Sequence, residues 1–202
     1  GPKVLPALRI ALRDGHWRQR ANAAYTLGLF GPAAFPALQD LIRATHAAQW
    51  QIRRTSAWAI GKIGPKAQSA APALFALLYD PSFQVRQHAL RSLPPLQLPS
   101  PILQTPLHHF FQTTQDSEDL LFSIRVYPLK NLDESSFFAW RKLLHITKKE
   151  SHIFFALRAL QPHPAYALRA LPEIMAALDR YGTQRIRHKI AQILSAIGPL
   201  AV

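Results

Sequence analysis

A short motif that recurs at a fixed interval is the feature that most constrains how this chain can fold. Residues 27–32 read Leu-Gly-Leu-Phe-Gly-Pro, residues 60–65 read Ile-Gly-Lys-Ile-Gly-Pro, and residues 194–199 read Leu-Ser-Ala-Ile-Gly-Pro. The first two copies are 33 residues apart, and proline-bearing steps continue at about that interval between them and the third. A period of this length is the signature of stacked structural units. We predict one array over residues 1–202, part of a longer protein, with approximate repeats at 3–32, 33–65, 66–98, 99–130, 131–163 and 164–199.

Each unit holds two segments with helical periodicity, and no β pattern is evident. The first segment usually opens with a step such as Pro-Ala-Leu, which suits a first helical turn because proline lacks the N–H that would be unpaired there. The second segment starts near an arginine and ends at Gly-Pro, where glycine can take the left-handed cap and proline cannot continue the helix. Short paired helices can bury their apolar faces away from water only by stacking on neighbouring pairs. The sequence therefore predicts an all-α fold, an α-solenoid of about six helix pairs following a right-handed superhelix.

The composition excludes several classes of protein. With 24 Lys and Arg against 11 Asp and Glu the formal net charge is +13, but hydrophobic residues make up 49% and charged residues 17%, which excludes a disordered polyelectrolyte. Cysteine is absent, which excludes disulfides, thiolate metal sites and a cysteine nucleophile, so we expect a cytoplasmic protein. No apolar run approaches the roughly 18 residues of a membrane span, and we expect no membrane partner.

These features together resemble HEAT repeats of the short bacterial type, often called phycobilisome-lyase-like HEAT repeats. The resemblance rests on the Gly-x-x-Gly-Pro ending, the Pro-Ala-Leu opening, and an acid followed six residues later by arginine, as in Asp14 with Arg20 and Asp80 with Arg86. It is strong over 1–98, weak over 99–163 and clear again over 164–202. It implies that the second helices line a concave face and that the acids and arginines form a ladder.

One aligned column of the second helices stands out as a candidate binding surface. Counting five residues on from Arg20, Arg53, Arg86 and Arg187 gives a column that contains aromatic and arginine side chains and no acid. Arginine and aromatic side chains recognise carboxylates, phosphates and bases. The column three residues before the arginines, Trp17 to Gln184, is interpreted instead as packing between repeats. The predicted partner-binding residues are Tyr25, Arg54, Trp58, Arg91, Arg125 and Arg158, with Arg18 and Lys62 nearby.

A search for catalytic chemistry finds no constellation. No histidine is followed by glutamate, which disfavours the di-iron site of HEAT proteins that resemble metal hydroxylases. His108 and His109 would point about 100° apart on a helix and cannot share a metal. The acids at 116–119 and 133–134 are interpreted as helix caps. We therefore predict no catalytic residue, no metal and no cofactor; the sequence favours a non-catalytic protein and leaves an enzymatic role open.

Three functions follow from these observations. The first is an interaction scaffold that binds an acidic partner, by preference a protein segment, through a basic concave face. The second is nucleic-acid binding, because a basic aromatic HEAT groove resembles that of the HEAT-like alkylpurine DNA glycosylases, although the aligned columns contain no aspartate for their catalysis. The third, implied by the family resemblance, is a bilin lyase-like chromophore-handling factor. A small-molecule partner is not expected from the sequence.

Overall fold

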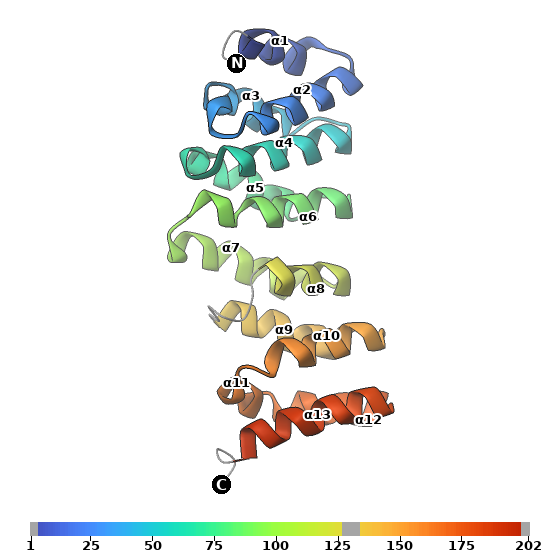
Figure 1. The fold of residues 1–202 in the computed structure, drawn as a ribbon. Helices are drawn as coiled ribbons and strands as arrows, with labels where there is room; N and C mark the ends of the chain where they lie inside the picture. Colours follow the sequence, from blue (N-terminus) through green and yellow to red (C-terminus); the bar gives the residue numbers. More distant parts are fainter. Residues whose placement is uncertain (1–3, 127–133, 199–202) are drawn as a thin grey trace. The chain divides into compact units, whose positions relative to one another are not determined.

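The computed structural model describes residues 4–126 and 134–198, and every regular element in these two ranges is a helix (Figure 1). The chain divides into two compact units, Gly1–Pro106 and Leu107–Val202. The prediction of an all-α fold built from stacked helix pairs is confirmed. That the six predicted repeats form one array stays a prediction, and each unit is described by itself.

In the first unit, helices alternate between two layers. Its elements are α1 (Leu5–Asp14), α2 (Trp17–Leu29), the 3₁₀ helix η2 (Gly31–Ala37), α3 (Leu38–Ala44), α4 (Trp50–Ile63), η3 (Gly64–Ala70), α5 (Ala71–Leu77), α6 (Phe83–Ser92) and η4 (Pro94–Leu96). The second helices α2, α4 and α6 contact one another in order. Helix α7 (Ser100–Thr113) runs across the division between the units.

The second unit continues the alternation of helices. It contains α8 (Ser117–Val126), α9 (Glu134–Ile146), α10 (Glu150–Leu160), α11 (Pro164–Arg169), α12 (Leu171–Tyr181) and α13 (Gln184–Ile197). Here α8, α10 and α13 are the second helices, and α10 contacts both of the others.

The core shows the sequence period directly. In five of the six second helices the residue just before the candidate binding column is apolar and buried, so these preceding residues face inward toward the first helices. They are Ala24, Ala57 and Leu90 in the first unit and Ile124 and Leu157 in the second; in α13 the residue before Gln192 is the exposed Ala191, and Ile190 is the buried one. The next position along each helix must therefore lie at the edge of the buried stripe, about 100° round the axis.

Two of the three glycines at the repeat endings take positive φ values. These are Gly31 and Gly64, with φ of 55° and 76°, but ψ of Gly64 is −144°, which is not the left-handed helical cap that the sequence predicted. Gly198 has φ −37° and ψ −45°, so the prediction of a left-handed cap is wrong there and the backbone stays helical. The 3₁₀ helices η2 and η3, which begin at Gly31 and Gly64, were not predicted.

A left-handed residue also occurs where the third repeat has no glycine. Gln97 stands 33 residues after Gly64 and has φ 53° and ψ 45°. A positive φ therefore occurs at this position without glycine, although ψ differs from the −144° of Gly64. An L-residue in this conformation costs roughly 1–2 kcal/mol because Cβ crowds the neighbouring carbonyl oxygen.

Glycines in the other motif position let the second helices approach closely. A Cβ added to Gly28 would overlap the ring of Trp58 on α4, and one added to Gly61 would lie 2.9 Å from Cα of Ser92 on α6. The first glycine of Gly-x-x-Gly-Pro therefore serves packing between successive repeats, while the second serves the turn.

The predicted ladder of acids and arginines forms with a different register. Arg86 donates to the backbone carbonyl of Asp80, at 3.0 Å. The Asp80 carboxylate instead accepts two hydrogen bonds from Arg53 of the preceding repeat, at 2.6 and 2.8 Å. Arg20 likewise donates to a carbonyl, that of Leu12, at 2.9 Å. An arginine of the predicted column thus pairs with an acid that follows a first helix, but Asp80 and Arg53 belong to successive repeats.

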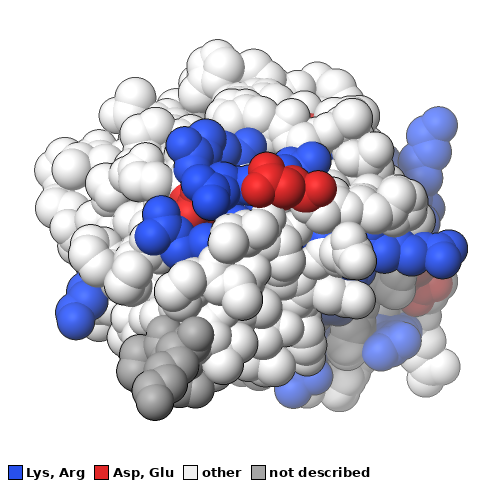
Figure 2. Space-filling model, turned by 90° about the horizontal axis from the view of Figure 1, so that it is seen from above, with Lys and Arg blue, Asp and Glu red and all other residues white. Residues whose placement is uncertain are grey.

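A second buried acid binds arginines that the ladder did not include. The Asp40 carboxylate accepts from Arg9 at 2.5 Å and from Arg43. Burial alone would raise the pKa of Asp40, but the two guanidinium groups hold it below its usual value. Figure 2, which looks onto the α1 end of the first unit, shows Lys and Arg side chains gathered there beside acidic ones.

The close approach at Gly28 generates a prediction for Gly28→Ala. Alanine favours a helix interior by about 1 kcal/mol over glycine, but the overlap with Trp58 costs about 1–3 kcal/mol, so urea unfolding should show a net loss of stability. In a Trp58→Ala background the same substitution should lose nothing or add stability. An equal loss in both backgrounds would contradict the packing role of Gly28.

The left-handed conformation of Gln97 generates a second prediction. Gln97→Gly removes the Cβ penalty and should raise the free energy of unfolding by about 0.5–1 kcal/mol, after the extra flexibility of glycine in the unfolded chain is counted. The matched control is Gln87→Gly within α6, which should lower stability by about 1 kcal/mol. Destabilisation by both substitutions in urea titrations would refute the strain at residue 97.

Candidate partner-binding surface

Most of the predicted binding residues lie in the first unit, on the side of the second helices turned away from the core. Arg18, Tyr25, Lys62 and Arg91 are exposed, and Arg54 and Trp58 are half-exposed. We call this side of α2, α4 and α6 the unit-1 face; it comprises Arg18, Tyr25, Arg54, Trp58, Lys62 and Arg91. That this side is concave stays a prediction. Arg125 and Arg158 lie in the second unit and are described separately.

An aromatic pair lies at the centre of the unit-1 face. The rings of Tyr25 and Trp58 stack with their centroids 4.9 Å apart and an angle of 14° between their planes. Gly28 makes room for the Trp58 ring on α2, as described above. Because the two rings already contact each other, no third ring can enter between them, and a ligand would meet the exposed surface of Tyr25 and the half-exposed Trp58.

Positive charge surrounds the aromatic pair. The Lys62 ammonium lies 5.5 Å from the centre of the Trp58 ring, and Arg54 stands one helical turn before Trp58 with its guanidinium 5.4 Å from the Trp50 ring. Arg18 makes the same kind of contact with Trp17 at 5.1 Å. Rings thus hold these cations in place through cation–π attraction without neutralising them.

His88 reports how close the cations are to one another. Its pKa is lowered by burial first and then by the positive charges of Arg54 and Arg91, against a backbone hydrogen bond with Gln84 that acts to raise it. His88 therefore lies within the electrostatic reach of arginines on both α4 and α6. The sequence analysis did not place His88 on this surface, because histidine at a single position gives no periodic signal.

Acidic side chains are missing from the second helices of this unit. Helices α2, α4 and α6 contain no aspartate or glutamate. Among the described residues, Arg18, Arg54 and Lys62 make no hydrogen bond or ion pair, whereas Arg53, directly beside Arg54, is bound to Asp80. The structure thus separates Arg53, which holds repeats together, from cations that contact rings and have no carboxylate partner among the described residues.

In the second unit, aromatic side chains lie under the arginines. Arg125 lies over the ring of Phe155 at 4.7 Å, and Arg185 over Phe154 at 3.8 Å. Arg158 is exposed one turn after Phe154. The sequence analysis missed the two phenylalanines, because the central repeats lack the Gly-x-x-Gly-Pro motif.

The second helices of the second unit also carry acids. Glu118 on α8 pairs with Lys149 and lies 3.3 Å from the buried His152. Glu150 on α10 accepts a hydrogen bond from Thr183. The surface around Arg125 and Arg158 is therefore of mixed charge, unlike the unit-1 face.

Candidate catalytic and metal-binding groups have structural explanations. Asp116 accepts a hydrogen bond from the backbone N–H of Glu118 at 2.9 Å, which is the capping role predicted for it. His108 contacts the side chain of Gln112 at 2.8 Å and packs against Phe138. Within the described part of the chain no group of three metal-ligating side chains occurs. The predicted cap at 133–134 lies outside the described side chains.

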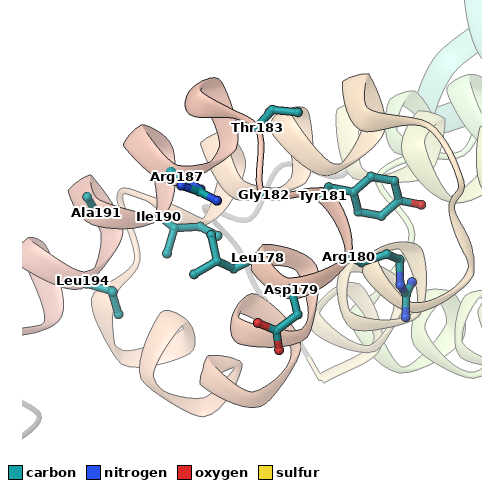
Figure 3. A pocket seen from close by; sticks show the side chains of 10 residues that line it. All are labelled: Leu178, Asp179, Arg180, Tyr181, Gly182, Thr183, Arg187, Ile190, Ala191 and Leu194. Carbon is teal, nitrogen blue, oxygen red and sulfur yellow. The ribbon is translucent and has the colours of Figure 1, made fainter.

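A hollow between α12 and α13 offers no convergent chemistry (Figure 3). Leu178, Ile190 and Leu194 line its apolar part. Figure 3 shows the side chain of Tyr181 pointing away from these apolar groups. Separately, no helix within 4–126 or 134–198 is long and apolar enough to cross a bilayer.

The electrostatics of His88 generate a prediction. Arg54→Gln removes one of the two positive charges that lower the pKa of His88, so the pKa should rise while burial and Arg91 keep it below the ordinary value. The measurement is an NMR titration of the imidazole protons in both proteins. Arg18→Gln, at the far end of the same face, is the control and should leave that titration unchanged; no shift in Arg54→Gln would refute the proximity.

Comparisons with known proteins find one family with a similar sequence and several solved structures with a similar fold. The family described as HEAT repeats matches residues 4–94. The complex of CpcE and CpcF of phycocyanin lyase from Nostoc sp. PCC7120 is similar in structure, with TM-score 0.50, 19% identity, and coverage of 97% of this chain and 94% of that chain.

Two further solved structures are similar at lower scores. An engineered protein has TM-score 0.48 and 14% identity, with 96% of both chains covered. The Kap95:Nup1 complex has TM-score 0.46 and 14% identity, with 96% of this chain and 30% of that chain covered. No curated protein matches the sequence. The resemblance stated from the motifs is therefore confirmed where it was strongest, because residues 4–94 match the HEAT-repeat family.

Proposed function

We propose that this protein is a non-catalytic HEAT-repeat scaffold whose unit-1 face binds an acidic segment of a partner protein. The observation that carries the proposal is the one-signed charge of this face: helices α2, α4 and α6 have no acid, and Arg18, Arg54 and Lys62 have no carboxylate partner among the described residues. Carboxylates of a bound segment would supply the missing counter-charge, and the rings already restrain the cations that would bind them. The lack of cysteine is in keeping with a cytoplasmic setting.

Nucleic-acid binding is the second candidate, because the same cations would also meet phosphates. Two observations weigh against base recognition. The Tyr25–Trp58 pair is closed to an inserted ring, and the second helices of the first unit offer no aspartate of the kind that the alkylpurine DNA glycosylases require. A chromophore-handling role draws only on the likeness to the phycocyanin lyase complex, which at 19% identity is a likeness of fold.

The proposal predicts a local effect of charge removal. A fluorescently labelled peptide rich in glutamate should bind the protein, and Arg54→Gln with Lys62→Gln should weaken binding about tenfold, which corresponds to about 1.4 kcal/mol. The matched control is Arg13→Gln with Lys66→Gln, which removes two exposed charges of the same unit outside the unit-1 face and should change affinity less than about twofold. A third variant, Arg125→Gln with Arg158→Gln, measures whether the second unit contributes.

Equal losses in the first two double variants would show that bulk charge, not the unit-1 face, governs binding. Binding of duplex DNA is measured in parallel to test the second candidate function. If the DNA binds through three to five phosphates, the logarithm of its binding constant should fall with the logarithm of salt at a slope of roughly −3 to −5. Tighter binding of DNA than of the peptide at physiological salt, lost in the Arg54 and Lys62 variant, would replace the protein partner with nucleic acid.

A further inference from the structure

We infer that the acidic segment bound by the unit-1 face also carries an apolar side chain, which lies on Tyr25 and Leu29 of α2. This inference rests on the proposed function and specifies the chemistry of its partner: a peptide in which a leucine-like or aromatic residue is flanked by carboxylates. Three features of the face support it: its apolar surface, the cations beside that surface and the partners that the combination excludes.

The first feature is the exposure of the two side chains. Tyr25 is 49% exposed and Leu29 is 64% exposed, and they stand one helical turn apart on the same face of α2. No other two exposed large apolar side chains among the described residues of the first unit have this spacing. Single exposed apolar residues are ordinary on protein surfaces, but two adjacent ones form a continuous apolar area that a partner side chain can cover.

The second feature is the position of this apolar area beside the cations. Tyr25 stacks on Trp58, and the Lys62 ammonium lies over the Trp58 ring. Near the ends of α2 and α4, the backbone carbonyl of Lys62 lies 3.5 Å from the position that a Cβ on Gly31 would take. Gly31 follows Leu29 by two residues in the sequence. The apolar area is therefore bordered by the end of α4 that carries Lys62, with Arg54 one turn before Trp58 on the same helix.

The third feature separates the classes of partner. A nucleic-acid backbone presents phosphates and sugars but no apolar side chain that would cover Leu29. A purely acidic peptide would pair with Arg54 and Lys62 and leave Tyr25 and Leu29 in water. A segment with an apolar residue between carboxylates satisfies both parts of the surface, because hydrophobic burial and charge pairing then occur in one contact.

The test compares two peptides of equal length and charge, one with leucine and one with serine at the centre of the same glutamate-rich sequence. The leucine peptide should bind the wild-type protein about tenfold more tightly, and this ratio should persist between low and high salt because apolar burial is not screened. Leu29→Gln should abolish the ratio without changing affinity for the serine peptide. Tyr25→Gln should act in the same direction.

The matched control is Ile10→Gln, which replaces a side chain on α1 that is 53% exposed and should preserve the tenfold ratio. Circular dichroism and urea unfolding establish that each variant is folded. If both peptides bind equally well and the Arg54 and Lys62 variant weakens both, the inference is overturned while the proposed function stands. If neither peptide binds at millimolar concentration, the proposed function fails and the inference fails with it.

Discussion

The close approach of successive second helices is the constraint on which the first unit depends. Gly28 and Gly61 have no side chain where the ring of Trp58 and the backbone of Ser92 come nearest. Because of this close contact, residues that are 33 positions apart in the sequence lie in line along the stack. The column of Ala24, Ala57 and Leu90 is therefore buried, and the column that follows it in sequence lies at the edge of the buried stripe. The Tyr25–Trp58 pair is a direct product of this alignment, because the two rings belong to different helices.

Neighbouring arginines on α4 illustrate how one helix serves both stability and binding. Arg53 points to the first-helix side, where it donates to Asp80 of the next repeat and to the carbonyls of Ala47 and Ala48. Arg54 follows it in sequence but lies about 100° round the helix axis, where a ring and other cations surround it. The buried acid stabilises the stack, whereas Arg54 on the outer side has no carboxylate partner among the described residues.

The sequence period was sufficient to predict the helix pairs and the outward column in the first unit, because both depend on residues that recur every 33 positions. Contacts that depend on single side chains could not be predicted in this way. The register of Asp80 with Arg53 is set by the distance between repeats rather than along the chain, and the left-handed turn at Gln97 persists without the glycine that signals it. Phe154 and Phe155 were missed because the central repeats lack the motif that aligns the others.

The combination of cations with exposed apolar side chains has a physical consequence for selectivity. At physiological ionic strength charges more than about 8 Å apart are largely screened, and an exposed ion pair contributes roughly 0–1 kcal/mol. Arg54 and Lys62 therefore act mainly on the rate of encounter and on the exclusion of basic partners. A partner that also covers Tyr25 and Leu29 gains a contribution that salt does not remove, and this contribution slows its dissociation. Discrimination among acidic proteins would then depend on the apolar residue, while the choice of acidic over basic proteins would depend on the arginines and the lysine.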